Sequence, residues 1–204
     1  MGRDDDIAAI DRALKARGGR PTIAALHGLR GVGKTTLAAA YAERYRERYR
    51  AIWWIRAETE STAQADLVGL AVQFGWVAAN AAEGPAVDSA RQKLREEGDG
   101  ILLVYDNARN ADQIGPYLPH GGMTHILITS NAPNWSGVPA PIAIRKWSRG
   151  TGADDLVSQT DRPNERAAAV ALSTALDGLP LAHEQAAAYC ARTGLPLGHY
   201  RQKT

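Results

Sequence analysis

The strongest constraint on the fold of this chain is a phosphate-loop pattern, G-x-x-x-x-G-K-[ST], which its residues match as Gly28-Leu29-Arg30-Gly31-Val32-Gly33-Lys34-Thr35. An apolar run, residues 22–26, precedes this segment, and an uninterrupted helix-forming stretch, residues 35–50, follows it. Glycines allow such a loop to curl so that backbone N–H groups face phosphate oxygens, and the N-terminus of the following helix adds positive potential. The sequence therefore predicts a strand, a phosphate loop and a helix in succession, and a site for a nucleoside triphosphate or diphosphate.

A second chemical group lies at the end of another apolar run, Ile101 to Tyr105, which is followed directly by Asp106. Such a run is typical of a strand buried on both faces of a parallel sheet. A carboxylate at the tip of this strand can hold the Mg²⁺ that bridges the β- and γ-phosphates, with the Thr35 hydroxyl as a further ligand. We therefore assign the metal to Thr35 and Asp106, and the candidate catalytic roles to Lys34 and Asp106. The alternatives are a glycine-rich turn with a chance lysine and an aspartate that only caps a turn.

Apolar segments alternate with helical patterns along most of the chain. Strands are expected at residues 22–26, 51–56, 101–105, 126–128 and 142–144. A helix that Gly18-Gly19 ends is expected before the first of them. Strands that alternate with helices predict a doubly wound α/β fold, here that of a P-loop NTPase. Its parallel sheet of about five strands would bind its ligand at the carboxyl ends of the strands.

The strand signals stop after about Ser148. Asp161-Arg162-Pro163 predicts the start of a helix that runs through Leu176, and a further helix is expected from Pro180 to Arg192. We therefore divide the chain into a nucleotide-binding domain, residues 1–148, and a small helical subdomain, residues 149–204.

Charge and composition narrow the classes of partner. The 24 Lys and Arg residues nearly balance the 22 Asp and Glu residues, so the chain lacks the positive excess that drives binding to nucleic acid or to an anionic membrane. Its apolar runs are shorter than a membrane span, and residues 1–6 do not resemble a signal peptide. Cys190 is the single cysteine, which excludes an internal disulfide. We expect a cytoplasmic protein with no membrane partner, and we do not expect nucleic acid as a partner of this segment.

Four motifs make the chain resemble the NB-ARC nucleotide-binding module of the signal-transduction ATPases with numerous domains (STAND), in its bacterial form. These motifs are Gly2-Arg3-Asp4, Gly28 to Thr36, Leu102 to Asn107, and Gly178-Leu179-Pro180-Leu181-Ala182. The resemblance implies ADP or ATP with Mg²⁺ as the ligands. It also implies that Arg3 lies by the adenine and that Pro180 packs near the nucleotide.

Together, the motifs and the resemblance give one set of expected nucleotide-binding residues. The set is Arg3, Gly28, Gly31, Val32, Gly33, Lys34, Thr35, Thr36, Ser130, Asn131 and Pro180.

The sequence departs from the family pattern in two places, at Asn131 and after Gly194, and at Asn107 it has a form that bacterial members of the family often show. Asn107 stands where many hydrolytic relatives carry a second carboxylate, and an amide cannot accept a proton from the attacking water. Glu58 is a candidate base in its place, or simply an exposed residue at a strand end. Asn131 stands where the family usually has an arginine, so discrimination of ATP from ADP is expected to be weaker. The few residues after Gly194 leave the helical subdomain incomplete, as part of an ARC1-like unit.

These features predict a switch module that rests with ADP, is active with ATP and hydrolyses ATP slowly or not at all. Its partners would be the adenine nucleotide, effector and sensor domains of the same full-length chain, and further copies in a homo-oligomer when activated. One alternative is an actively hydrolysing AAA-like P-loop ATPase. A P-loop kinase would need an arginine-bearing lid that the sequence does not show, and a nucleic-acid-binding regulator would need salt-dependent DNA binding.

Overall fold

The computed structural model describes residues 3–15, 22–135 and 141–200. Its contacts divide the chain into two compact units. The sheet unit comprises Asp4–Gly28 and Lys34–Ala143, and the helical unit comprises Met1–Arg3, Leu29–Gly33 and Ile144–Thr204. Gly2, Gly18 and Gly19, to which the sequence analysis gave roles, lie outside the described residues.

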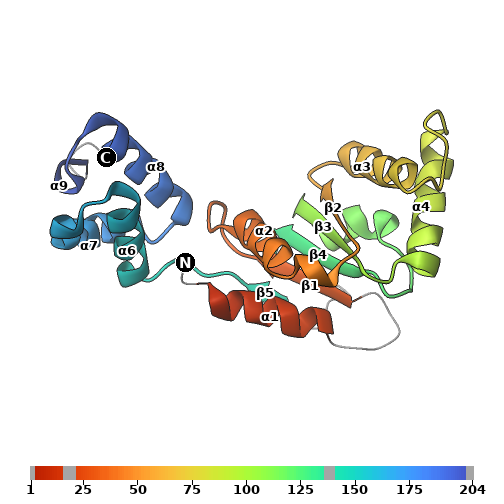
Figure 1. The fold of residues 1–204 in the computed structure, drawn as a ribbon, viewed down its shortest axis with the longest axis horizontal. Coiled ribbons are helices and arrows are strands. Elements are labelled where there is room, and N and C mark those ends of the chain that lie inside the picture. The colour runs from red at the N-terminus through yellow and green to blue at the C-terminus, as the bar shows by residue number, and fades with distance from the viewer. Residues whose placement is uncertain (1–2, 16–21, 136–140, 201–204) are drawn as a thin grey trace. The chain divides into compact units, whose positions relative to one another are not determined.

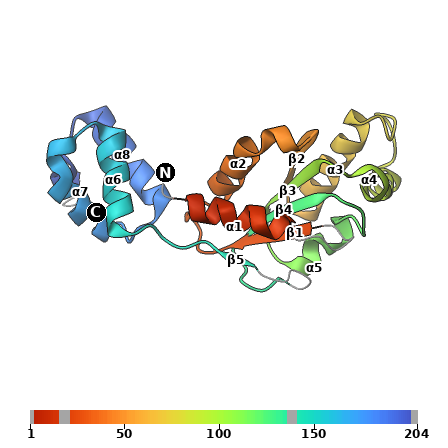
Figure 2. The same ribbon diagram turned by 60° about the horizontal axis from the view of Figure 1, so that its bottom comes forward.

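The sheet unit is built on five parallel strands in the order β2-β3-β4-β1-β5 (Figures 1 and 2). The strands are β1 (Thr22–His27), β2 (Ala51–Arg56), β3 (Ile101–Ala108), β4 (His125–Ser130) and β5 (Ile142–Ala143). All five lie where the sequence predicted a strand, although β1, β3 and β4 extend further and β5 is one residue shorter. The prediction of a doubly wound α/β fold with about five strands is confirmed.

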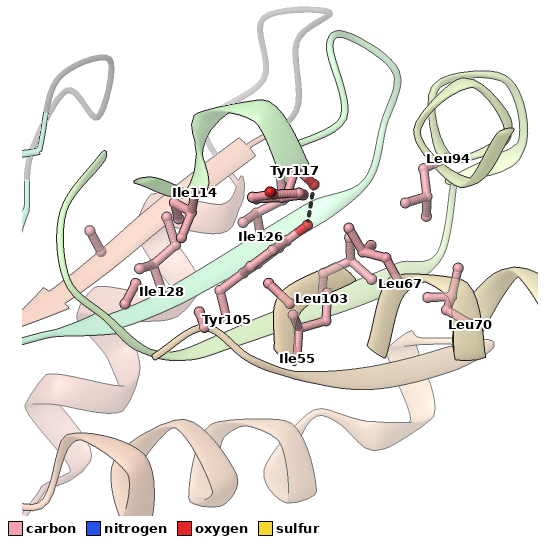
Figure 3. Packing of buried hydrophobic residues seen from close by; sticks show 14 of the residues in the cluster. Ile55, Leu67, Leu70, Leu94, Leu103, Tyr105, Ile114, Tyr117, Ile126 and Ile128 are labelled. Carbon is pink, nitrogen blue, oxygen red and sulfur yellow. Dashed lines mark hydrogen bonds between the residues drawn. The ribbon is translucent and has the colours of Figure 1, made fainter. Parts of the chain in front are cut away.

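Helices cover both faces of this sheet. They are α1 (Asp4–Lys15), α2 (Lys34–Arg44), α3 (Glu60–Gln73), α4 (Glu83–Glu97) and α5 (Ala111–Ile114), with 3₁₀ turns at Arg46–Arg48 and Gly115–Tyr117. Alternate strand residues such as Leu103, Tyr105 and Ile126 join Leu67 and Leu94 in one core on the side of α3, α4 and α5 (Figure 3). Neighbouring strand residues point to the opposite face, where α1 and α2 pack. The central strands β3 and β4 are therefore apolar over most of their length, because both of their faces are buried.

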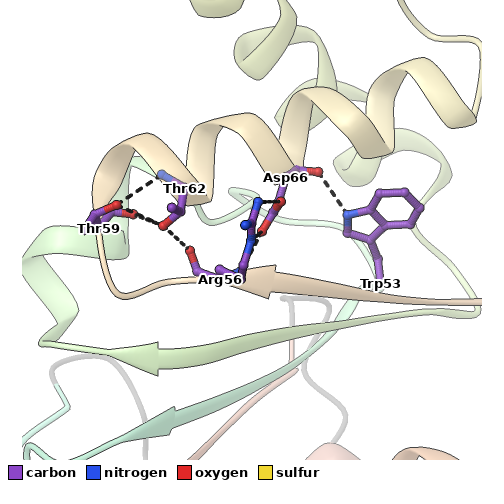
Figure 4. A network of polar contacts seen from close by, with 5 residues as sticks. All are labelled: Trp53, Arg56, Thr59, Thr62 and Asp66. Atoms are coloured by element: carbon purple, nitrogen blue, oxygen red, sulfur yellow. Dashed lines mark hydrogen bonds and ion pairs between the residues drawn. The ribbon is translucent and has the colours of Figure 1, made fainter.

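Polar contacts close part of the outer edge of β2, which is an edge strand of the sheet (Figure 4). The Asp66 carboxylate on α3 accepts hydrogen bonds from the Arg56 backbone N–H at 2.8 Å and from the Arg56 guanidinium at 2.7 and 3.0 Å. The Thr62 hydroxyl donates to the Arg56 carbonyl at 2.8 Å, and the Trp53 indole N–H donates to the Asp66 carbonyl at 2.9 Å. An exposed strand edge invites unwanted pairing, so these bonds both attach α3 to β2 and protect the end of the strand.

The helical unit has a small core of its own. Its elements are α6 (Arg149–Thr160), a 3₁₀ turn at Pro163–Glu165, α7 (Arg166–Ala175), α8 (Pro180–Thr193) and α9 (Leu197–Tyr200). Ala153, Leu156, Leu172, Ala186 and Cys190 are among the side chains buried between them. The His183 imidazole is also buried: its Nδ1 donates to the Leu179 carbonyl at 2.8 Å, and its Nε2 accepts from the Ser173 hydroxyl at 2.9 Å.

The helices of the structure differ from the expected ones in three places. The continuous helix over residues 35–50 is wrong, because α2 ends at Arg44 and a 3₁₀ turn follows. Tyr49 lies beyond that turn, where its hydroxyl pairs with Tyr41 and with Nδ1 of His125, each at 2.9 Å. The helix expected from Asp161 begins at Arg166 after a 3₁₀ turn, and α6 was not predicted at all.

A glycine in α6 generates the first prediction. A Cβ at Gly152 would lie well inside van der Waals contact with the Ser173 hydroxyl and the His183 ring, whereas a Cβ at Gly150 would meet Ser148 only at 3.7 Å. Gly152→Ala should therefore lower the free energy of unfolding by about 1–3 kcal/mol through overpacking. Gly150→Ala, in the same helix, should be neutral or stabilising because alanine favours helix. Urea denaturation of both variants measures this, and equal stability of the two would contradict it.

A second prediction concerns pH. Burial lowers the pKa of His125 from its ordinary value of 6.5, while the carboxylates of Asp99 and Asp11 partly oppose that effect. The unfolded chain therefore binds more protons than the folded chain as the pH falls through about 6.5, so stability should decrease on acidification. His125→Gln should remove part of this dependence. The free energy of unfolding of both proteins, measured from pH 7.5 to pH 5, tests the prediction, which fails if the two slopes agree.

Candidate functional site

The phosphate-loop sequence forms a turn between β1 and α2. β1 ends at His27 and α2 begins at Lys34, as the motif predicted. Gly31 and Gly33 have φ angles of +79° and +91°, values that residues with a β-carbon rarely adopt. Val32 between them is fully buried, and its backbone N–H donates to the Leu29 carbonyl at 3.3 Å. The local geometry therefore requires the glycines of the motif.

Lys34 is a buried cation at the start of α2. Only 8% of the residue is exposed. Its Nζ donates to the Gly28 carbonyl at 3.0 Å and to Oδ1 of Asn131 at 2.8 Å. Burial lowers the pKa of Lys34 below its ordinary value, and the charge of Asp106 partly restores it. Asn131, which follows β4 directly, is therefore in contact with the lysine of the loop.

Asp106 at the end of β3 is surrounded by hydroxyl groups. Its Oδ1 accepts a hydrogen bond from the Thr35 hydroxyl at 2.8 Å and a second from the Thr129 hydroxyl at 2.6 Å. Thr129 also accepts from the backbone N–H of Asn107 at 2.9 Å. Thr129 is a site residue that the sequence analysis did not assign. The sequence offered one signal for this residue: Thr129 lies on the strand that ends at Ser130, and Asn131 follows that strand directly.

The pair formed by Thr35 and Asp106 fits the chemistry of Mg²⁺, which prefers hard oxygen ligands. The Thr35 hydroxyl and Oδ1 of Asp106 are brought together by a hydrogen bond of 2.8 Å, so both oxygens are available to one magnesium ion. Across the described parts of the chain, no group of three or more His, Cys, Asp or Glu residues could hold a metal.

The remaining expected residues of the sheet unit differ in their surroundings. The Ser130 hydroxyl is buried and donates to the Ala108 carbonyl at 2.6 Å, while it accepts from the Ala132 N–H at 3.0 Å. It thereby fixes the chain on both sides of Asn131. Thr36 is exposed on α2. Glu58 is exposed after β2, and its backbone carbonyl accepts from Gln113 at 3.2 Å.

Arg3 and Pro180, which the sequence also places at the nucleotide, belong to the helical unit together with the loop residues Gly31, Val32 and Gly33. The Arg3 guanidinium donates to the Val32 carbonyl at 2.9 Å. Pro180 is the first residue of α8, and a Cβ at Gly33 would meet its ring at 3.9 Å. The backbone N–H of the next residue, Leu181, donates to the Gly31 carbonyl at 3.2 Å. Within this unit, Arg3 and the start of α8 therefore both contact the loop segment Leu29–Gly33.

A search for membrane-crossing helices gives a negative result: within residues 3–15, 22–135 and 141–200, no helix combines enough length with enough apolar character to span a bilayer.

Solved structures share the fold at low sequence identity. A STAND protein with a tetratricopeptide repeat sensor from Pyrococcus horikoshii is 14% identical, with a TM-score of 0.59 over 88% of this chain and 28% of its own. Cdc6p from Pyrobaculum aerophilum is 14% identical, with a TM-score of 0.55 over 95% of this chain and 63% of its own. The ORC2 protein of Aeropyrum pernix, solved in ADPNP-ADP complexes, is 13% identical, with a TM-score of 0.66 over 99% of this chain and 68% of its own.

This chain thus spans 28% of the STAND protein and 63% of Cdc6p, and the likeness concerns the fold of P-loop ATPases. No curated protein matches the sequence. The sequence model described as the AAA ATPase domain, in contrast, matches residues 1–193, which is nearly the whole chain. This chain is therefore a member of the AAA ATPase domain family, a nucleotide-binding P-loop ATPase module.

Proposed function

We propose that this chain is the adenine-nucleotide switch of a larger signalling ATPase of the NB-ARC type, resting with ADP and active with ATP. The observation that carries the proposal is the meeting of Lys34 with Asn131 and of Thr35 with Asp106, at 2.8 Å in each case, beside a glycine-rich turn. A cation, an amide and an oxygen pair suited to Mg²⁺ are the groups that a magnesium nucleoside polyphosphate needs.

The chain's own groups give a direct account of phosphate binding. The Lys34 ammonium donates to the Gly28 carbonyl and to Oδ1 of Asn131, which are both neutral oxygens. A phosphate oxygen carries negative charge, and its Coulombic attraction to the ammonium adds to the hydrogen bond, so phosphate oxygens would compete well for this ammonium. The backbone N–H groups of the loop and the N-terminus of α2 would stabilise the same negative charge. Bound Mg²⁺ would supply charge neutralisation between the phosphates, held by Thr35 and Asp106.

The residues around Asp106 favour retention of the nucleotide over rapid hydrolysis. Asn107 carries an amide where a second carboxylate would serve as a base, and its φ of +60° is a left-handed conformation. Asn131 brings no positive charge to the terminal phosphate, although its contact with Lys34 keeps an amide beside the phosphate site. Slow turnover suits a switch, in which occupancy of the site carries the signal.

The switch also needs two states that the nucleotide can bias. A nucleotide shifts an equilibrium between two states only toward the state that binds it more tightly, so ADP and ATP would have to differ in their affinity for the two states. We propose residues 1–148 as the nucleotide-binding domain and residues 149–204 as a partial ARC1-like subdomain.

The proposed partners follow from the same role. Effector and sensor domains would belong to the same full-length chain, and further copies would join it in a homo-oligomer when ATP is bound. Because the proposed ligand is a magnesium adenine nucleotide, we place the protein in the cytoplasm.

A second candidate function is an AAA ATPase in which turnover matters more than occupancy. Membership of the AAA ATPase domain family favours this candidate. The two candidates differ in the fate of the nucleotide: a switch keeps ADP, and an active ATPase releases it.

Lys34 provides a test of nucleotide binding. Mg-ADP at about 100 times its dissociation constant should add roughly 2.7 kcal/mol of stability and raise the melting temperature by about 5–11 °C. Lys34→Ala should lose most of this shift because the buried ammonium is removed. Lys93→Ala is the control, since Lys93 pairs with Glu97 at 2.8 Å on the surface of α4. An unchanged shift in Lys34→Ala would remove Lys34 from the site.

The switch can be separated from the active ATPase by its nucleotide content. Freshly purified protein, denatured and analysed by chromatography, should release ADP in near-stoichiometric amount, and steady-state release of phosphate from ATP should be slow. Empty protein with sustained phosphate release would favour the second candidate.

A further inference from the structure

The pairing between β3 and β4 contains an irregularity at the site. The register is regular from Leu102 opposite His125 to Tyr105 opposite Ile128, and it resumes with Ala108 opposite Ser130. Two residues of β3, Asp106 and Asn107, therefore face the single residue Thr129 of β4. This is a β-bulge, which is rare between parallel strands and which often redirects a side chain beside a functional site.

One hydroxyl group satisfies both residues of the bulge. The backbone N–H of Asn107 can only donate, so Thr129 Oγ1 accepts there at 2.9 Å. Its own proton is then directed to Oδ1 of Asp106 at 2.6 Å. Thr129 is 1% exposed, so water does not readily replace these bonds. The residue thus binds the amide of the left-handed Asn107 and the carboxylate of Asp106 at once.

The bond from Thr129 has a direct consequence for the carboxylate. It fixes the rotation of the Asp106 carboxylate about its side-chain bond, with Oδ1 placed 2.8 Å from the Thr35 hydroxyl. It comes from the neighbouring strand and does not belong to the phosphate loop, so it holds the carboxylate independently of that loop. Groups that orient metal ligands in this way commonly change metal affinity about 10- to 100-fold when they are removed.

We propose that Thr129 is a positioning residue that builds this bulge and orients Asp106 to hold the magnesium of a bound nucleotide. This inference rests on the proposed function, because it assumes a magnesium nucleotide at Thr35 and Asp106. It adds a residue outside the phosphate loop, and it assigns the bulge in β3 a role in binding the metal.

The test measures how strongly Mg²⁺ improves nucleotide binding. A fluorescent ADP analogue is titrated into the full chain with EDTA and at increasing Mg²⁺ concentrations. Thr129→Val, which keeps the shape but removes the hydroxyl, should raise the Mg²⁺ concentration needed for half of the improvement about 10- to 100-fold. Its affinity in EDTA should stay within about twofold of the original protein, because the contacts of the loop remain. Thr129→Ser, which restores the hydroxyl, should behave like the original protein.

A matched control separates this role from the general cost of losing a buried hydroxyl. Thr124 is fully buried, and its hydroxyl donates to the Leu94 carbonyl at 3.0 Å near the other end of β4. Thr124→Val should leave the Mg²⁺ dependence unchanged. Thr129→Val in an Asp106→Asn background should add no further effect, since the hydroxyl acts through the carboxylate.

Several outcomes would overturn the proposal. One is an unaltered Mg²⁺ dependence in folded Thr129→Val, and another is an equal loss of affinity in EDTA and in Mg²⁺. Thr129→Ala is measured beside it in case the valine variant does not fold. If neither folds while Thr129→Ser does, the hydroxyl serves stability and the proposal is wrong. If the original protein binds no nucleotide, both this inference and the proposed function are wrong. If it binds nucleotide with equal affinity in EDTA and in Mg²⁺, this inference is wrong, but nucleotide binding stands.

Discussion

Parallel pairing of β1, β3 and β4 is the constraint from which the site follows. Parallel strands end at the same edge of a sheet, so the segments after β1, β3 and β4 emerge beside one another. Gly28 directly follows β1, Asp106 lies near the end of β3, and Asn131 directly follows β4. Asp106 and Asn131 are far from the phosphate loop in the sequence, and the register of the strands brings them beside Lys34 and Thr35.

The polar groups at this edge of the sheet form hydrogen bonds with one another, and a charged ligand could replace some of these bonds. Burial of an ammonium group is costly unless it is hydrogen-bonded, and Lys34 uses Gly28 and Asn131 for this purpose. Asp106 likewise accepts bonds from Thr35 and Thr129. The bonds of Lys34 and Thr35 are those that a phosphate and a metal would replace, whereas the bond of Thr129 comes from the scaffold. The hydrogen-bond partners of Lys34 and Thr35 can therefore be exchanged for a ligand, whereas the bond from Thr129 to Asp106 is retained.

The packing of the helical unit depends on a close contact between Gly152 of α6 and two buried side chains. Gly152 lacks a β-carbon where α6 meets the buried pair of Ser173 and His183. His183 donates in turn to the carbonyl of Leu179, the residue just before Pro180. The turn that begins α8 is thus held from inside the unit, and a small residue in α6 makes room for the side chain that holds it. The packing of this unit and the conformation of the Gly-Leu-Pro turn are therefore linked.

Strand positions were readable from the sequence because strands buried on both faces are continuous apolar runs with clear ends. β3 begins at Ile101 as predicted, and its residues Ile101 to Tyr105 are all buried, for this reason. α6 was not readable: Arg149–Thr160 contains two glycines and few apolar residues, and it is helical because Ser148 caps it and Ala153 and Leu156 are buried against α7 and α8. The end of α2 was not readable either, because it is accompanied by tertiary contacts of the Tyr49 hydroxyl with Tyr41 and His125.

By itself, the sequence determined the phosphate loop, the aspartate at the end of its strand and the parallel α/β class, since spacing along the chain encodes all three. The tertiary structure decided which side chains complete the site. The contact of Asn131 with Lys34, and the bulge that Thr129 fills opposite Asp106 and Asn107, both depend on the register between strands. A register relates residues that are more than twenty positions apart, and no local pattern of residues records it.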